Sequence, residues 1–119
     1  MVGLGGFLGS ITRFIASKSI DDKLNVAFPY GTLTVNILGS FILGFVYALA
    51  MRKADFPETW RLLLGAGFCG GFTTFSAFAW ENLNLIQGRL LSSSILYILL
   101  SLFAGFLAVW SGAWFSRFF

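Results

Sequence analysis

Residues 65–78 read GAGFCGGFTTFSAF, an uncharged run in which a Gly-Gly pair precedes Thr73, Thr74 and Ser76. Each Gly costs a helix about 1 kcal/mol relative to Ala, and Thr and Ser hydroxyls offer the backbone other hydrogen-bond partners. The run therefore predicts a helix that is broken near its middle. In lipid, the freed backbone groups must be buried in protein or line a polar cavity, and broken membrane helices tend to mark ion sites.

The composition places this run in a membrane. Of the 119 residues, 57% are hydrophobic and only 11% are charged, and the mean hydropathy is +0.83. A soluble domain has about 25% charged residues, and a chain of this size has too little interior to hide so much apolar surface. The excess is expected to face lipid, so we predict an all-α membrane protein.

Charged residues divide the chain into segments of membrane-spanning length. None lies within residues 24–51, 62–80 or 90–116, and about 20 apolar residues cross a bilayer. The pattern predicts a single four-span domain, residues 1–119, with spans at about 2–17, 30–51, 59–87 and 90–115 and polar linkers at 18–29, 52–58 and 87–89. A cleaved signal peptide would carry its positive charge before the apolar run. Because Arg13 follows that run, we expect a short first crossing instead.

The residue types exclude several chemistries. The chain has no His and one Cys, Cys69, which excludes a His/Cys metal cluster, a Ser-His-Asp triad and an internal disulfide. The basic residues are scattered rather than clustered on one segment, so we expect no nucleic-acid partner. Nothing in the sequence predicts an enzyme.

The basic residues balance across the predicted spans. With four crossings, one side of the membrane carries Arg52, Lys53, Arg61 and Arg117, and the other carries Lys18, Lys23 and Arg89, with Arg13 near the end of the first span. Lys and Arg in short loops set orientation, so a near tie predicts insertion in both directions and permits an antiparallel homodimer. The alternative is one orientation, set by a partner or by local hydrophobicity.

Small residues four apart occur in every predicted span, where they allow helix backbones to approach closely. The pairs are Gly5 and Gly9, Ser40 and Gly44, Gly67 and Gly71, and Ser101 and Gly105. Helix packing without a specific function is the favoured interpretation for most of them.

A few polar and aromatic side chains are candidates for an ion path. Phe75 and Phe78 share a helical face, and the positive edges of their rings can face a small anion; packing against lipid or neighbouring helices is the more common role. Asn36 in the second span either bonds across helices or faces a wet path. Tyr97 and Ser101 form a short polar track. Since no span has a carboxylate near its middle, a neutral path suits an anion better than a cation.

Two stretches together resemble the Fluc fluoride channel family, also called the CrcB family. They are GTLTVNILGS at residues 31–40 and GFCGGFTTFSAF at residues 67–78. The resemblance implies a passive, fluoride-selective channel in the cell membrane that lets cytoplasmic fluoride leave the cell. It also implies an antiparallel dual-topology homodimer with two pores and a structural sodium ion on the dimer axis.

The resemblance implies a role for individual residues as well. The aromatic box corresponds to Phe75 and Phe78, the pore-lining Asn to Asn36, and the polar track to Tyr97 and Ser101. Main-chain carbonyls of Gly70 and Thr73 would hold the sodium ion. Vestibule or supporting roles fall to Arg13, Glu81, Thr74 and Ser76.

Two positions depart from the family's pattern. Gly105 stands where the track usually has another hydroxyl, so the track ends early or is completed by Ser94 or Ser111. Ala77 replaces the motif's second Thr, from which we expect an altered rate before lost selectivity. Two other classes stay open: a small multidrug-type dual-topology exchanger, for which Glu81 is the only candidate proton carrier, and a structural membrane subunit.

Overall fold

The computed structural model describes all residues, 1–119, as helices joined by short connections. The first two long helices are α1 (Val2–Leu24) and α2 (Tyr30–Arg52). A third helical stretch runs through α3 (Glu58–Trp60), the π-helical η1 (Arg61–Cys69) and α4 (Gly70–Phe72), and resumes as α5 (Ser76–Gln87). The chain ends with α6 (Leu91–Phe115) and the 3₁₀ turn η2 (Ser116–Phe118).

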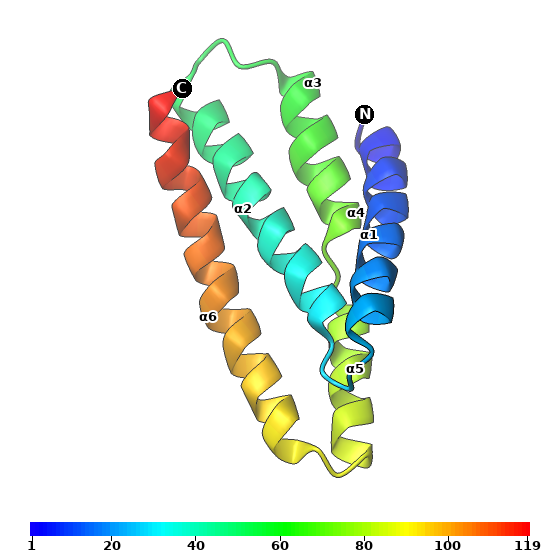
Figure 1. Ribbon diagram of the computed structural model, residues 1–119. Helices are drawn as coiled ribbons and strands as arrows, with labels where there is room; N and C mark the ends of the chain where they lie inside the picture. The colour runs from blue at the N-terminus through cyan, green and yellow to red at the C-terminus, as the bar shows by residue number, and fades with distance from the viewer.

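The helices form an elongated bundle, 52 × 26 × 21 Å along its principal axes. Helix α2 packs along α6, while α1 packs on η1 and α4 (Figure 1). Beyond the point where α4 ends, α5 continues toward the far end of the molecule and returns into α6. Both chain termini lie at the same end (Figure 1).

Glycines make the closest helix contacts in the bundle. Between α2 and α6, Gly44 faces the backbone of Val109 and Gly112 faces that of Phe41, so a Cβ at either position would collide with a backbone carbonyl. On α1, Gly5 and Gly9 lie against the backbone of η1 in the same way. The glycines of the predicted small-residue pairs thus lie at helix contacts, except Gly105, which has no neighbouring atom within 4 Å of where its Cβ would be.

The first half of the polar linker expected at residues 18–29 is helical, because α1 continues to Leu24. The hydroxyl of Ser17 donates to the Arg13 carbonyl at 2.8 Å, and Lys18 and Asp22 form an exposed i,i+4 ion pair at 3.6 Å. An i,i+4 ion pair of this kind supports a helix beyond its apolar part. The helix ends where Asn25 adopts a left-handed conformation with φ 48°, which Asn tolerates better than most residues.

Three helical stretches are long and apolar enough to cross a membrane: Tyr30–Arg52, Glu58–Gln87 and Leu91–Phe118. Helix α1 is not among them, since it contains Arg13 and a charged C-terminal part. Many large apolar side chains are exposed along these stretches, including Phe103 and Phe106 on α6, which are 75% and 76% exposed. The protein is therefore a multi-pass membrane protein.

Candidate functional site

Regular helix is interrupted at residues 73–75, between α4 and α5. Thr73 is extended, with φ −90° and ψ 157°, so the Thr74 amide has no helical carbonyl to donate to. Its partner is a side chain of α2. The Thr74 N–H donates to the Asn36 Oδ1 at 2.8 Å, and the Asn36 Nδ2 donates to the Thr74 carbonyl at 3.1 Å. One Asn therefore pairs with both backbone groups of Thr74, a half-buried residue.

Hydroxyl groups cap the two helix ends that face each other here. The Thr73 hydroxyl donates to the Cys69 carbonyl at 2.8 Å. The Thr74 hydroxyl accepts from the Ala77 N–H at 3.2 Å, at the start of α5, and lies 3.4 Å from the Ser76 hydroxyl. The Thr74 hydroxyl thus gives a partner to the Ala77 N–H, one of the amides that the start of a helix leaves free, while the Cys69 carbonyl also accepts from the Thr73 N–H at 2.9 Å.

A groove of about 320 Å³ lies beside the interruption. Asn36 and Ser40 of α2 line one side, Ser101 and Gly105 of α6 line another, and residues 73–75 with Phe78 complete the wall. The Phe75 and Phe78 rings are tilted by 44° with centroids 5.9 Å apart, and Phe75 is 78% exposed. The Ser101 hydroxyl is buried without a hydrogen-bond partner.

The structure brings four of the five predicted pore residues to this groove: Asn36, Phe75, Phe78 and Ser101. The predicted supporting residue Thr74 also lines it. Tyr97 does not, because it is fully buried behind Phe78, with ring centroids 4.9 Å apart. Neither Ser94 nor Ser111 extends the track into the groove.

A second polar cluster lies behind the groove, and the sequence predicted only part of it. The Thr32 hydroxyl donates to the Glu81 Oε2 at 3.0 Å, while the Glu81 Oε1 and the Tyr97 hydroxyl are buried without partners. Nearby, the Ser94 hydroxyl donates to the Asn82 Oδ1 at 2.8 Å. Thr32 was not among the predicted site residues. Its position four residues before Asn36, on the same face of one helix, is the feature that could have identified it as part of a polar cluster.

Arg13 lies away from the groove but contacts the segment that precedes the interruption. Its Nε donates to the Gly71 carbonyl at 3.2 Å. The two predicted sodium ligands, the carbonyls of Gly70 and Thr73, accept no hydrogen bond from any backbone or side-chain donor. No cluster of His, Cys, Asp or Glu suited to a metal ion occurs in the chain.

Comparison with known proteins relates this arrangement to a family. The "Fluoride-specific ion channel FluC" of Leptospira interrogans is 40% identical over 114 residues, which cover 96% of this chain and 90% of the relative. The protein of the same name from Chlorobium chlorochromatii is 41% identical over 112 residues, covering 94% and 86%. That of Bacteroides fragilis is 40% identical over 114 residues, covering 93% and 89%.

The family described as "CrcB-like protein, Camphor Resistance (CrcB)" matches residues 1–113. That match spans α1 to α6 and so includes the interruption, the groove and the cluster behind it. With relatives about 40% identical along most of its length, this chain belongs to the CrcB-like family, a family of ion channels and not of enzymes.

Proposed function

We propose that this protein is a passive, fluoride-selective channel. The observation that carries the proposal is the groove at residues 73–75, where an amide, hydroxyls and two aromatic rings meet and no carboxylate lines the wall. Such a wall does not repel an anion, and it lacks the acidic ring typical of cation pores. The names of the relatives support the choice of fluoride as the anion.

The groove offers donors that replace water around a small, strongly hydrated anion. An Asn amide has two N–H donors, and only one of those on Asn36 is used by the Thr74 carbonyl. The Ser101 hydroxyl has no other partner. The edges of the Phe75 and Phe78 rings carry the positive part of the aromatic quadrupole, so they add weak favourable contacts without binding the ion too tightly to release it.

We propose further that two copies associate as an antiparallel dimer with two pores in the cell membrane, through which cytoplasmic fluoride leaves down its gradient. The balance of Lys and Arg between the two ends of the bundle supports insertion in both orientations. The exposure of Phe75 and the open space beside Gly105, both on the wall of the groove, support a second copy that covers this face.

The chemistry of the interruption fits a sodium ion between two such copies. The Gly70 and Thr73 carbonyls accept no hydrogen bond, and oxygens of unwound membrane helices are typical sodium ligands. A bound cation supplies positive field to an anion path without a basic side chain in the pore. In this chain, the hydrogen bonds from Arg13 and Asn36 hold the carbonyls of Gly71 and Thr74, each the next residue after a proposed sodium ligand.

Efflux from liposomes tests the proposal. Purified protein is reconstituted into vesicles loaded with fluoride or chloride, and release is followed with ion-selective electrodes. We expect fast fluoride release without a proton gradient, with chloride retained. Release that requires a proton gradient would instead identify an exchanger, and no release of either anion would identify a structural subunit; both results contradict the proposal.

A further inference from the structure

A second pocket lies at the end of the bundle where α2 and α6 both finish, far from the groove at residues 73–75. It has a volume of about 530 Å³ and is lined by Met51, Arg52, Trp110, Trp114 and Arg117, with two Ala residues between them. The site thus combines two guanidinium groups with two indole rings over an apolar floor. None of these residues takes part in the proposed ion path.

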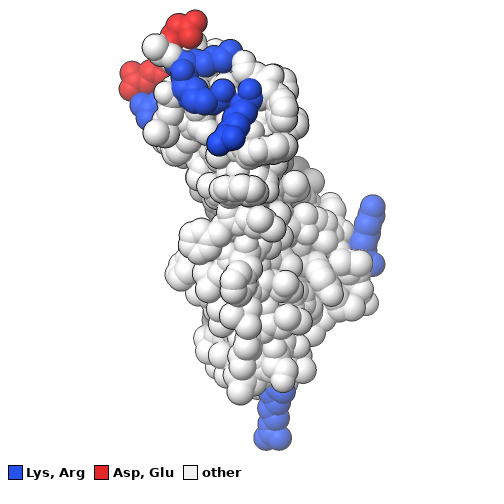
Figure 2. Space-filling model, turned by 90° about the vertical axis from the view of Figure 1, so that its left-hand side faces the viewer, with Lys and Arg blue, Asp and Glu red and all other residues white.

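The two Arg side chains of this pocket form no ion pair. The only ion pairs in the chain are Lys18–Asp22 and Arg61–Glu58, so neither Arg52 nor Arg117 contacts a carboxylate. The Arg52 guanidinium instead donates to the backbone carbonyl of Ser116 and to its hydroxyl, the latter at 3.0 Å, which fixes it against η2. Figure 2 shows basic side chains gathered at this end of the molecule with acidic side chains beside them, while the body below carries little charge apart from a basic side chain on its flank.

The position of the pocket identifies the kind of anion that fits it. Because α2 and α6 are membrane-spanning segments, their common end lies where lipid headgroups are. Trp side chains favour that depth, and Trp110 and Met51 are 66% and 87% exposed there. Arg matches phosphate oxygens in a planar, bidentate geometry. Basic pockets between membrane helices are suited to anionic lipid headgroups.

We propose that this pocket binds the phosphate of an anionic glycerophospholipid, with the Arg52 and Arg117 guanidinium groups on the headgroup and the Trp side chains against the lipid below it. The inference does not depend on which ion the protein conducts. A zwitterionic lipid of the same chain length offers the same apolar contacts but no net negative charge, and is therefore held less firmly.

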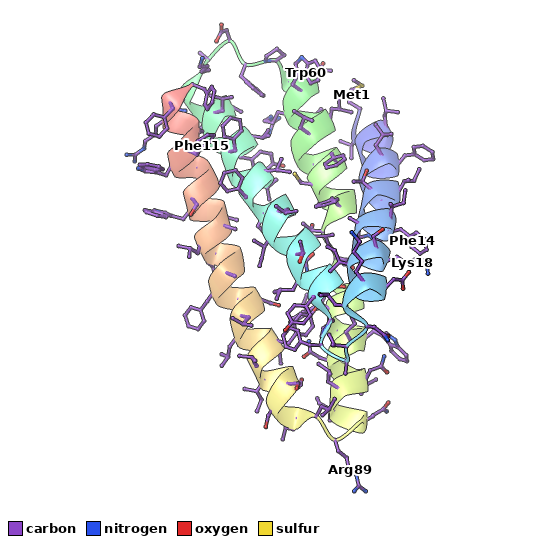
Figure 3. The ribbon with its side chains drawn as sticks, in the orientation of Figure 1. Met1, Phe14, Lys18, Trp60, Arg89 and Phe115 are labelled. Carbon is purple, nitrogen blue, oxygen red and sulfur yellow. The ribbon has the colours of Figure 1, made fainter.

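Native mass spectrometry of the full chain tests this proposal. The protein is extracted from vesicles of phosphatidylglycerol and phosphatidylcholine in equal amounts, and the retained lipids are counted. The variant is Arg117→Gln, because Arg117 is exposed and makes no side-chain hydrogen bond on which folding depends. The matched control is Arg89→Gln, an exposed cation that projects from the opposite end of the bundle (Figure 3).

We expect the wild type and Arg89→Gln to retain phosphatidylglycerol in preference to phosphatidylcholine, and Arg117→Gln to lose that preference about fivefold, as expected for one basic residue near a membrane surface. Equal retention by the two variants would overturn the proposal. Displacement of the lipid by inorganic phosphate at millimolar concentration would also overturn it, since the site would then recognise the free ion.

Discussion

Phe75 and Phe78 differ in their surroundings although they share one wall of the groove. Phe75 is 78% exposed, whereas Phe78 is half-buried between Phe75 and Tyr97. A ring that packs on another ring is held in place, so Phe78 has the better defined edge. Both rings are nevertheless required if fluoride exchanges water for ring edges in succession.

Phe75→Ile and Phe78→Ile should each lower fluoride efflux from proteoliposomes by about tenfold, the effect of raising a barrier by about 1.4 kcal/mol. An Ile side chain fills similar space but has no positive ring edge. Phe103→Ile is the control, because Phe103 is 75% exposed on α6 and does not line the groove. Undiminished efflux in both groove variants would remove the rings from the mechanism.

Asn36→Leu should destabilise the protein by about 1–3 kcal/mol for each Thr74 backbone group left without a partner. The side chain now satisfies both the N–H and the carbonyl of Thr74, and Leu can do neither. The midpoint of thermal unfolding in detergent measures the change. Asn84→Leu is the control, since Asn84 is exposed and makes no side-chain hydrogen bond. Equal midpoints for the two variants would show that the Asn36 bonds contribute nothing.

At the scale of the helices, Gly39 sets how closely α2 approaches the interruption. A Cβ at this position would collide with the Thr73 methyl group and lie 3.2 Å from the Phe72 ring. Helix α2 therefore passes beside residues 73–75 at a distance that only a Gly allows.

Gly39→Ala should cost about 1–3 kcal/mol in unfolding free energy, because it forces side chains at the interruption to shift. Gly105→Ala on α6 is the matched control: its Cβ would meet nothing within 4 Å, and replacing Gly by Ala inside a helix favours the helix by about 1 kcal/mol. Chemical denaturation of both variants in the same detergent checks the difference. A Gly39→Ala protein as stable as the control would mean that the contact is loose.

The sequence was sufficient to predict the apolar parts of the helices but not their ends. The charged residues placed the end of the first span at residue 17. The helix itself continues to Leu24, since the Lys18–Asp22 ion pair supports it and Asn25 ends it. The ion pair and the left-handed Asn25 are local effects. The distribution of apolar and charged residues along the chain does not reveal them.

For the candidate site, the type of a residue predicted its bonding better than its spacing along the helix predicted where its side chain lies. An Asn in an apolar span needs a partner, and Asn36 does bond across helices, to Thr74. The expected track from Tyr97 to Ser101 did not lead into one groove, because Tyr97 packs inward against Phe28 and Phe78. Which side of a helix faces its neighbours depends on the crossing of α5 and α6, and spacing along one helix does not determine it.

At the scale of the whole molecule, charged side chains lie at both ends and on one flank, and the rest of the visible surface is uncharged (Figure 2). Near the C-terminal end of α1, the Asp21 carboxylate has a structural role, because it accepts a hydrogen bond from the Gly31 N–H at 2.9 Å. Ser19 and Asp22 beside it are exposed. These two positions can therefore be changed to alter the charge balance without removing that bond.

Ser19→Lys combined with Asp22→Lys should fix a single orientation, with this end on the cytoplasmic side, since Lys in short loops is retained there. Ser19→Gln with Asp22→Gln is the control for side-chain size and for loss of the Lys18–Asp22 pair. Protease-cleavable tags at both termini report orientation from outside intact cells. Tags that stay equally accessible in the Lys variant would contradict dual insertion, as would a single orientation in the unmodified chain.

The Thr74 amide proton offers a way to observe the interruption directly. Because it is bound to a side chain 38 positions away rather than to its own helix, its exchange with deuterated water follows the opening of that one contact. Helical amides on either side exchange only when their own turns unwind. A slow signal at Thr74 would thus mean that the two segments stay joined when no anion is present, and a fast one that they separate before any ion arrives.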